Sequence, residues 1–297
     1  MPARILMSKR TFAVLILTHG RPDRVITYKT LRDSGYDGRI IVVIDNTDKT
    51  AGEYRKRYGK DVVTFNKPAA AKITDTMDNF KNMKAVVYGR NIAWDIAKDH
   101  GLTHFLVMDD DYGRIGYAFG KVASYLINGP VKTGKLNDLF MATLDYLDRS
   151  NADCIAWAQG GDFIGGNQNS FVKEGLKPHR KIMNTFFLKT EKRFDFMGTI
   201  NEDTTAYVLH GMRGRLFLTF AGMRVGQAET QSNAGGLTDI YLQLGTYVKS
   251  FYTVIANPSC CKVRMMGAAN RRLHHSVTWD NAVPQIVSES LRKKRIN

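Results

Sequence analysis

Short continuous runs of apolar residues recur along the first half of the chain, and polar or amphipathic stretches separate them. We expect buried strands at residues 12–17, 39–44, 61–65, 105–108 and 154–158. The stretches between them have helical spacing at residues 25–34, 51–58, 90–100 and 136–150. Continuous β-branched runs that alternate with helices are typical of a parallel sheet covered on both faces.

The second half of the chain mixes strand-like, helical and glycine-rich segments. We expect strands at residues 181–188, 216–220 and 251–255, helices at residues 204–213 and 237–247, and loops at residues 159–169 and 227–239. Residues 67–83 are polar and lack clear periodicity, so we interpret them as a partly ordered loop near a functional site. The sequence contains no internal repeat and no linker, which favours a single α/β domain.

One strand ends in three carboxylates. Residues 104–108 are apolar after His104, and Asp109, Asp110 and Asp111 follow directly. Ligands bind at the carboxyl edge of parallel sheets, where this run would lie. Three adjacent anions repel each other, and Mg²⁺ or Mn²⁺ would neutralise them through carboxylate oxygens. The alternative is a solvated acidic turn after a strand.

Polar residues also follow the other strands of the first half. Thr18 and Arg21 come after the first strand, Asp45 closes the second, and Arg90 and Asn91 open the helix before the acidic strand. Because the ends of parallel strands share one edge, we expect these side chains near the aspartates. The first turn and Asp45 would then hold a nucleoside, and Arg90 would reach a diphosphate.

The pattern resembles the GT-A class of glycosyltransferases, which use nucleotide sugars and combine a Rossmann-like sheet with an Asp-X-Asp motif. Asp109-Asp110-Asp111 matches this motif in sequence and in its place after a hydrophobic strand. The resemblance implies one GT-A-like domain over residues 1–297, with a mostly parallel Rossmann-type sheet flanked by helices. About residues 1–112 would bind the nucleotide sugar, and about residues 113–297 the acceptor. Asp109 and Asp111 would hold the metal and Asp110 would contact the donor.

The same resemblance assigns roles to residues in the second half. An acidic pair at the start of a helix supplies the general base in many inverting enzymes of this class, which points to Asp203, or to Glu202 beside it. The alternative is a simple helix start, where acids interact well with the helix dipole. A late histidine can join the metal, so His274 and His275 are candidate ligands, and Arg271 would contact the diphosphate. Two structural histidines are an equally good interpretation.

The composition of the chain indicates which class of acceptor molecule it uses. The 297 residues carry a formal charge of +15, and the basic residues are spread over the whole chain. A broad basic surface fits a polyanionic partner, nucleic acid first and an anionic membrane surface second. No apolar run approaches the roughly 18–20 residues that span a bilayer. The three cysteines, at positions 154, 260 and 261, lack a metal-ligand spacing and indicate free thiols in a reducing cytoplasm.

The chain most resembles the TET-associated glycosyltransferases of bacteriophages. The matching segments are residues 18–21, 88–91, 108–111, 201–204 and 230–239. This resemblance implies transfer of a sugar, from a nucleotide sugar such as a UDP-sugar, onto 5-hydroxymethylcytosine in phage DNA. The reaction would be metal-dependent and would take place in the host cytoplasm, with no membrane partner.

Three other interpretations remain open. The same chemistry could act on a glycan, lipid or protein hydroxyl. A non-catalytic nucleic-acid-binding protein is disfavoured by three carboxylates that would repel phosphate unless a metal is present. A nucleotidyltransferase also uses carboxylates and metals, but it would show a glycine-rich basic fingerprint near the start, which this sequence lacks.

Overall fold

The structure is a computed structural model that describes residues 10–118, 135–159, 162, 175–177, 185–227, 247–266 and 271–284. Its strands are β1 Phe12–Leu17, β2 Arg39–Asp45, β3 Val62–Phe65, β4 His104–Asp109, β5 Tyr112–Tyr117, β6 Cys154–Ala158, β7 Leu176–Lys177, β8 Thr185–Lys189, β9 Phe217–Gln227, β10 Cys261–Met266 and β11 Arg272–Val277. Its α-helices are α1 Ile26–Asp33, α2 Ala51–Tyr58, α3 Lys67–Ile73, α4 Val87–Asp99, α5 Leu136–Ser150, α7 Glu202–Met212 and α9 Tyr247–Ala256. Short 3₁₀ turns cover Gly59–Asp61 and Trp279–Asn281.

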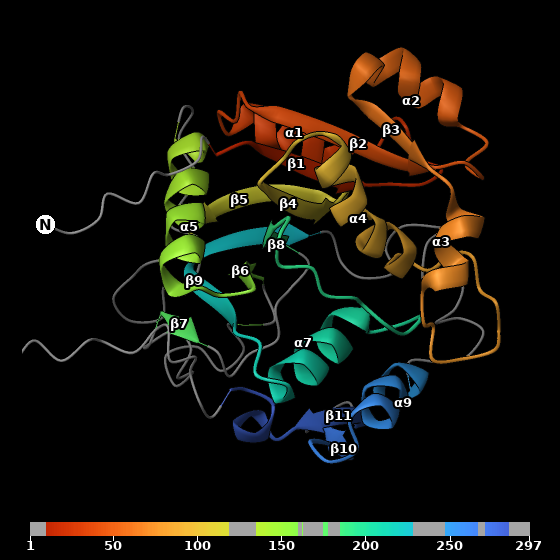
Figure 1. The fold of residues 1–297 in the computed structure, drawn as a ribbon, viewed down its shortest axis with the longest axis vertical. Helices are drawn as coiled ribbons and strands as arrows, with labels where there is room; N and C mark the ends of the chain where they lie inside the picture. The colour runs from red at the N-terminus through yellow and green to blue at the C-terminus, as the bar shows by residue number, and fades with distance from the viewer. Residues whose placement is uncertain are drawn as a thin grey trace, which may run out of the picture.

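The large sheet has the strand order β3-β2-β1-β4-β8-β6-β9-β5, and β7 pairs with β9. Strands β3, β2, β1 and β4 are parallel, β8 is antiparallel to both β4 and β6, and β6 is parallel to β9. The predicted α/β class, with a Rossmann-type sheet flanked by helices, is confirmed (Figure 1). Because the chain leaves β1 toward β2 on one side and returns as β4 on the other, the carboxyl ends of β1 and β4 form a topological switch point.

Alternate side chains of the central strands point to opposite faces of the sheet and form two hydrophobic cores. Val14 and Ile16 of β1 face a cluster shared with α1, α2 and α5, whereas Ala13, Leu15 and Leu17 face a cluster shared with α3, α4 and α7. Figure 1 shows α7 between the sheet and a carboxyl-terminal unit made of α9 and the β10–β11 hairpin. Side chains on both faces of the parallel strands are therefore buried, as the continuous apolar runs predict.

Some sequence expectations are wrong. Residues 67–73 form helix α3 instead of the start of a loop; Asn66 caps it by accepting from the Ala69 amide at 3.0 Å, and a proline lies in its first turn. Helix α4 begins at Val87, so Arg90 lies one turn inside it. The expected strand at residues 251–255 belongs to helix α9. Strands β5, β7, β10 and β11 were not expected.

Several expected segments lie outside the described residues. They are nearly all of the loops at 159–169 and 227–239, the helix at 237–247 apart from its last residue, and the start of the strand at 181–188. All three cysteines are buried free thiols. None of the helices in the described part of the chain is both long and apolar enough to cross a bilayer.

Candidate active site

The carboxyl ends of the central parallel strands meet as predicted. Leu17 at the end of β1 pairs with Asp109 at the end of β4. In the turns that follow, the Thr18 hydroxyl donates a hydrogen bond of 2.6 Å to Asp110 Oδ2. Arg21 Nε lies 3.2 Å from the same oxygen. The structure therefore brings Thr18, Arg21 and the aspartate run together at one edge of the sheet.

Asp110 uses its carboxylate to join these two turns. It is buried, and burial raises its pKa although Arg21 opposes the rise. Tyr54 of α2 completes the cluster, because its hydroxyl shares a hydrogen bond with Thr18 and accepts from the Arg21 amide. Thr18, Arg21 and Asp110 were all predicted to contact the donor; in this structure their side chains bind one another, and they shape the edge of the site.

Asp45 is surrounded by donors from its own protein. Lys67 Nζ and His19 Nδ1 lie 2.8 and 2.7 Å from Oδ2, and Thr47 donates to Oδ1 through both its amide and its hydroxyl. Burial favours the neutral acid, but the hydrogen bonds from His19, Lys67 and Thr47 outweigh it and lower the pKa of Asp45. These contacts occupy the roughly four acceptor positions of a carboxylate. Asp45 thus fixes His19 and Lys67, and the half-exposed His19 is the better ligand contact.

Arg90 connects the two halves of the chain. Its Nη2 lies 3.5 Å from Asp109 Oδ1 at the end of β4, and its Nη1 lies 3.2 Å from Glu202 Oε1 at the start of α7. The guanidinium is buried, and its central carbon stands 4.9 Å from the ring centre of Phe186 and 5.7 Å from that of Phe196. The predicted contact of Arg90 with a diphosphate does not suit this position, since both ends of the guanidinium face carboxylates.

The two carboxylates beside Arg90 are electrostatically strained. Burial raises the pKa of Asp109 to about 7, with Arg90 opposing and Asp111 and Glu202 adding to the rise. Burial also raises the pKa of Glu202, and Arg90 again opposes it. One guanidinium shared among several buried acids leaves this edge in need of further positive charge.

Asn91 has a different role from the predicted donor contact. Its Oδ1 accepts from the Phe196 amide at 2.8 Å, and its Nδ2 donates to the Phe196 carbonyl at 2.9 Å. This pair of bonds, both buried, ties α4 to the segment that leads into α7. Asn91 therefore positions Glu202 and Asp203 through the backbone before them.

Asp111 has the features of a metal ligand. Gln227 Nε2 donates to Oδ2 at 3.1 Å, whereas Oδ1 is buried and has no hydrogen-bond partner among the described residues. A buried carboxylate oxygen without a donor is costly unless a cation or water reaches it. Asp109 and Asp111 thus fit Mg²⁺ or Mn²⁺, which accept one or two carboxylates and keep positions for phosphate and water.

The predicted histidine ligands are not gathered with these aspartates. His274 and His275 lie on β11 of the carboxyl-terminal hairpin, stacked with ring centres 4.3 Å apart, and Arg271 is exposed just before them. Within the residues described, no three His, Cys, Asp or Glu side chains form a metal-binding group. The metal role of both histidines and the donor role of Arg271 stay predictions.

Asp203 lies next to Glu202 in the first turn of α7. Its Oδ1 accepts from the Thr204 amide at 2.7 Å, so it also stabilises the helix start, as the alternative interpretation predicted. Asn201 before it adopts a left-handed conformation with φ of 61°. Sequence reasoning missed Lys67 and Tyr54; the Asn-Lys-Pro helix start at residues 66–68 was the one available signal for Lys67.

Comparisons with known proteins place the chain. Glucosyl-3-phosphoglycerate synthase from Mycobacterium tuberculosis, in a crystal structure with Mn²⁺, UDP and phosphoglyceric acid, is 11% identical, with a TM-score of 0.46 over 91% of this chain and 87% of that chain. S. aureus TarS is 13% identical, with a TM-score of 0.37 over 74% of this chain and 35% of that chain. Both are distant likenesses, and a search of curated proteins finds no match. The family model of the TET-Associated Glycosyltransferase matches residues 12–236, so the chain belongs to this family of glycosyltransferases.

Proposed function

We propose that the protein transfers a sugar from a nucleotide sugar, a UDP-sugar in the first instance, onto 5-hydroxymethylcytosine in DNA, with Mn²⁺ or Mg²⁺ at the site. Family membership supplies glycosyl transfer, and the family is described as TET-associated. The resemblance to the phage enzymes implies that the acceptor is oxidised methylcytosine. The observation that carries the proposal is Arg90, buried between Asp109 of the first half and Glu202 of the second. One guanidinium joins a proposed metal ligand to the residue next to the proposed base, Asp203.

The donor half of this site would be built on Asp109 and Asp111. Their carboxylates would hold the metal, and the buried Oδ1 of Asp111, which has no donor in the described part of the chain, supports this assignment. A bound divalent ion supplies a Lewis acid that stabilises the departing diphosphate. His19, held by Asp45 and about half exposed, would contact the nucleoside.

The acceptor half would be built on the start of α7. Asp203 would take the proton of the acceptor hydroxymethyl group. The hydroxymethyl oxygen would bond to the anomeric carbon of the sugar as the bond between the sugar and the diphosphate breaks. Glu202 would stay fixed by Arg90, which lies 3.2 Å away, and would hold this turn in place. Both acids are buried, and exclusion of water strengthens such proton transfer. We keep Asp203 as the base and Glu202 as the second candidate.

The charge of the protein supports a DNA acceptor. There are 43 lysines and arginines against 28 aspartates and glutamates, although the site itself is acidic. We propose that residues 1–297 act as one unit in a reducing cytoplasm, with about residues 1–112 on the donor and about residues 113–297 on the acceptor. The buried thiols of Cys154, Cys260 and Cys261 agree with that compartment.

Binding to duplex DNA at increasing salt tests the acceptor. If the basic surface contacts phosphates, the logarithm of the binding constant falls with log salt, with a slope of about −0.9 per phosphate neutralised. Replacing Arg271 and Arg272 together should make the salt slope smaller if they contact DNA phosphates. The replacement should weaken donor binding if they contact the diphosphate. A flat salt response, together with transfer to a glycan, lipid or protein hydroxyl, would favour the alternative acceptors.

A further inference from the structure

The segment between α3 and α4 presents an exposed aromatic ring. We refer to residues 74–84 as the Phe80 loop. Phe80 is 69% exposed, whereas the other large aromatic side chains that are exposed, Tyr146 and Phe251, reach 45% and 43% within the described residues. A single exposed apolar residue needs no explanation by itself. The Phe80 loop is nevertheless fixed to the rest of the protein by several hydrogen bonds.

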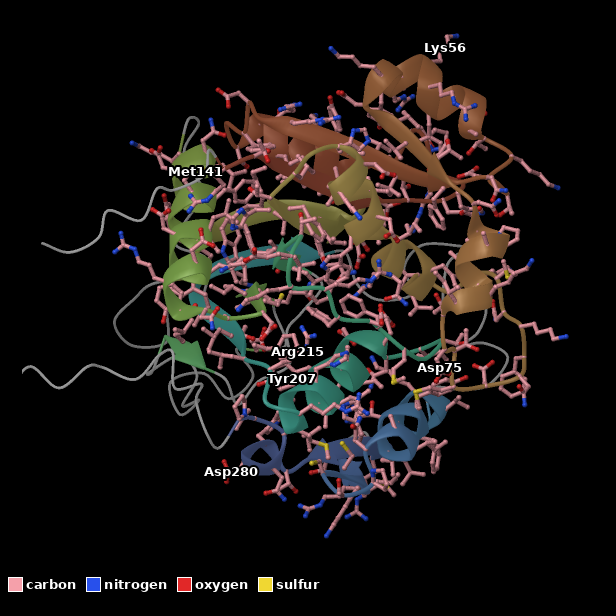
Figure 2. The ribbon with its side chains drawn as sticks, in the orientation of Figure 1. Lys56, Asp75, Met141, Tyr207, Arg215 and Asp280 are labelled. Atoms are coloured by element: carbon pink, nitrogen blue, oxygen red, sulfur yellow. The ribbon has the colours of Figure 1, made fainter. Side chains whose placement is uncertain are left out.

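The backbone of the Phe80 loop is anchored to the segment before α7. The Gly198 amide donates to the Asp75 carbonyl at 2.9 Å, and the Thr199 amide donates to the Thr76 carbonyl at 3.1 Å. The Tyr88 hydroxyl donates to the Asn82 carbonyl at 2.9 Å. Figure 2 labels Asp75, at the start of the loop, between α3 and α9. The loop therefore has a defined position on the body of the protein.

Side-chain contacts also fix the Phe80 loop. Asp78 Oδ2 accepts from the Thr199 hydroxyl at 2.7 Å and from the Tyr252 hydroxyl of α9, and Asp78 Oδ1 accepts from the Phe80 amide at 2.9 Å. Met77 packs against Ile200 and Tyr252. These contacts fix the backbone on either side of the exposed ring, so little conformational entropy remains to be lost when the ring binds something.

The loop borders the proposed acceptor base. Thr199, which contacts Asp78 and Thr76, precedes Glu202 by one short turn of chain. The segment that holds the loop is therefore the segment that delivers Glu202 and Asp203 to the site. The Phe80 loop is therefore fixed to the backbone that leads into the proposed acceptor side of the site.

The charge around the ring favours a polyanion. Lys72, Lys81 and Lys84, which lie within eight residues of Phe80 in the sequence, are exposed. Of the two acids in the loop, Asp78 is turned inward to Tyr252 and Thr199, and Asp75 is exposed. An aromatic ring among lysines is the combination that binds nucleic acid, because rings stack on bases while ammonium groups contact phosphates.

We propose that Phe80 is a wedge that stacks on the bases of the DNA acceptor beside the target cytosine, with Lys81 and Lys84 on the flanking phosphates. The inference rests on the proposed DNA acceptor and names how that acceptor is opened. Apolar side chains inserted between base steps unstack and kink duplexes, and enzymes that act on a base often take it out of the stack. A ring on a pre-ordered loop would support the gap that the target base leaves.

A duplex with one 5-hydroxymethylcytosine and a neighbouring 2-aminopurine tests the wedge, because 2-aminopurine becomes fluorescent when it is unstacked. The variants are Phe80→Ala and Phe80→Leu, with Tyr146→Ala of α5 as the matched exposed-aromatic control. We expect wild type and Tyr146→Ala to raise the fluorescence on binding. Phe80→Ala should lose most of that rise and bind about 5- to 100-fold more weakly, and Phe80→Leu should lie between them.

A mismatched duplex separates a wedge from a structural role. A mismatch lowers the cost of extracting the base, so the deficit of Phe80→Ala relative to wild type should shrink on it. Equal deficits on matched and mismatched duplexes, or wild-type behaviour of Phe80→Ala on both, would overturn the wedge. If wild type itself fails to bind DNA, the proposed function falls together with the wedge. If wild type binds and Phe80→Ala matches it, only the wedge falls.

Discussion

Arg90 Nη1 lies 3.2 Å from Glu202 Oε1, in a buried position that also brings Arg90 Nη2 to 3.5 Å from Asp109 Oδ1. The contact joins helix α4 to the first residue of α7, which is distant in sequence. Its electrostatic consequence is that one cation moderates two acids, the buried Glu202 and the partly buried Asp109, whose pKa values burial raises. The donor and acceptor sides of the proposed site therefore share one positioning residue.

Removing that cation should destabilise the protein strongly. Arg90→Met leaves Asp109 and Glu202 buried without their partner, and such losses cost about 3–5 kcal/mol. Urea unfolding should show this loss, and Arg90→Met combined with Glu202→Met should recover part of it, because the orphaned acid on α7 is gone. An Arg90→Met variant as stable as wild type would show that the bridge contributes little to the fold.

Asp111 should be needed for activity and dispensable for folding. Its Oδ1 has no hydrogen-bond partner within the residues that the structure describes, and Asp111→Asn keeps the shape and the contact with Gln227. We expect transfer to be abolished, Mn²⁺ binding by calorimetry to weaken, and the melting temperature to hold. Asp110→Asn is the contrasting variant, since it weakens the contacts with Thr18 and Arg21 and should lower the melting temperature. Full activity of Asp111→Asn, or of wild type in chelator, would end the metal-dependent proposal.

The base assignment predicts a loss of turnover. Asp203→Asn still accepts from the Thr204 amide but cannot take a proton, so the transfer rate should fall roughly 10²–10⁴-fold while donor affinity changes little. Glu202→Gln is the control, and it should lower stability more because it loses the charge that faces Arg90. A larger rate loss in Glu202→Gln than in Asp203→Asn moves the base to Glu202. Unfolding of both variants would support a purely structural helix start.

Acid should selectively remove the stabilisation that Asp148 provides. Burial opposes ionisation of this carboxylate, but hydrogen bonds from His104, Lys189 and Arg10 outweigh it and lower its pKa. A lowered folded-state pKa gives stability that is complete above the unfolded value of about 3.9 and is lost as pH falls below it. Asp148→Asn should therefore be less stable than wild type by about 2 kcal/mol at pH 6, and the gap should narrow below pH about 4. Thermal melts of both proteins from pH 7 to pH 3 check this, and a gap that widens in acid would contradict it.

The parallel half of the fold could be predicted because each strand is a continuous apolar run. Strands β1, β2 and β4 can be predicted from local sequence alone, because the continuous apolar runs at residues 12–17, 39–44 and 105–108 indicate strands that are buried on both faces. Helix α9 was mistaken for a strand because its β-branched residues at 253–255 outweighed its period. Its buried Ser250 and Thr253, together with Asn257 directly after the helix, recur at helical spacing, with Phe251 and Ile255 exposed on the other side.

The site was predicted in outline and not in its contacts. That the strand ends meet follows from parallel topology, and Thr18, Arg21 and Asp110 do meet. What each side chain contacts depends on partners far along the chain, such as Phe196 for Asn91 and Glu202 for Arg90. No local pattern encodes those pairs. The β10–β11 hairpin was not predicted. In β10, Lys262 and Arg264 alternate with apolar residues, a pattern that is also typical of an exposed basic segment.

The central claim is that this site moves a sugar onto hydroxymethylcytosine in DNA. Wild-type protein would be incubated with Mn²⁺, a panel of nucleotide sugars and a duplex that contains 5-hydroxymethylcytosine, and the DNA would then be digested and its nucleosides weighed. We predict a nucleoside heavier than 5-hydroxymethyldeoxycytidine by one sugar residue with at least one donor, absent from an unmodified cytosine duplex and from reactions with Asp111→Asn. No such nucleoside with any donor, alongside sugar transfer to a glycan, lipid or protein hydroxyl, would contradict the account.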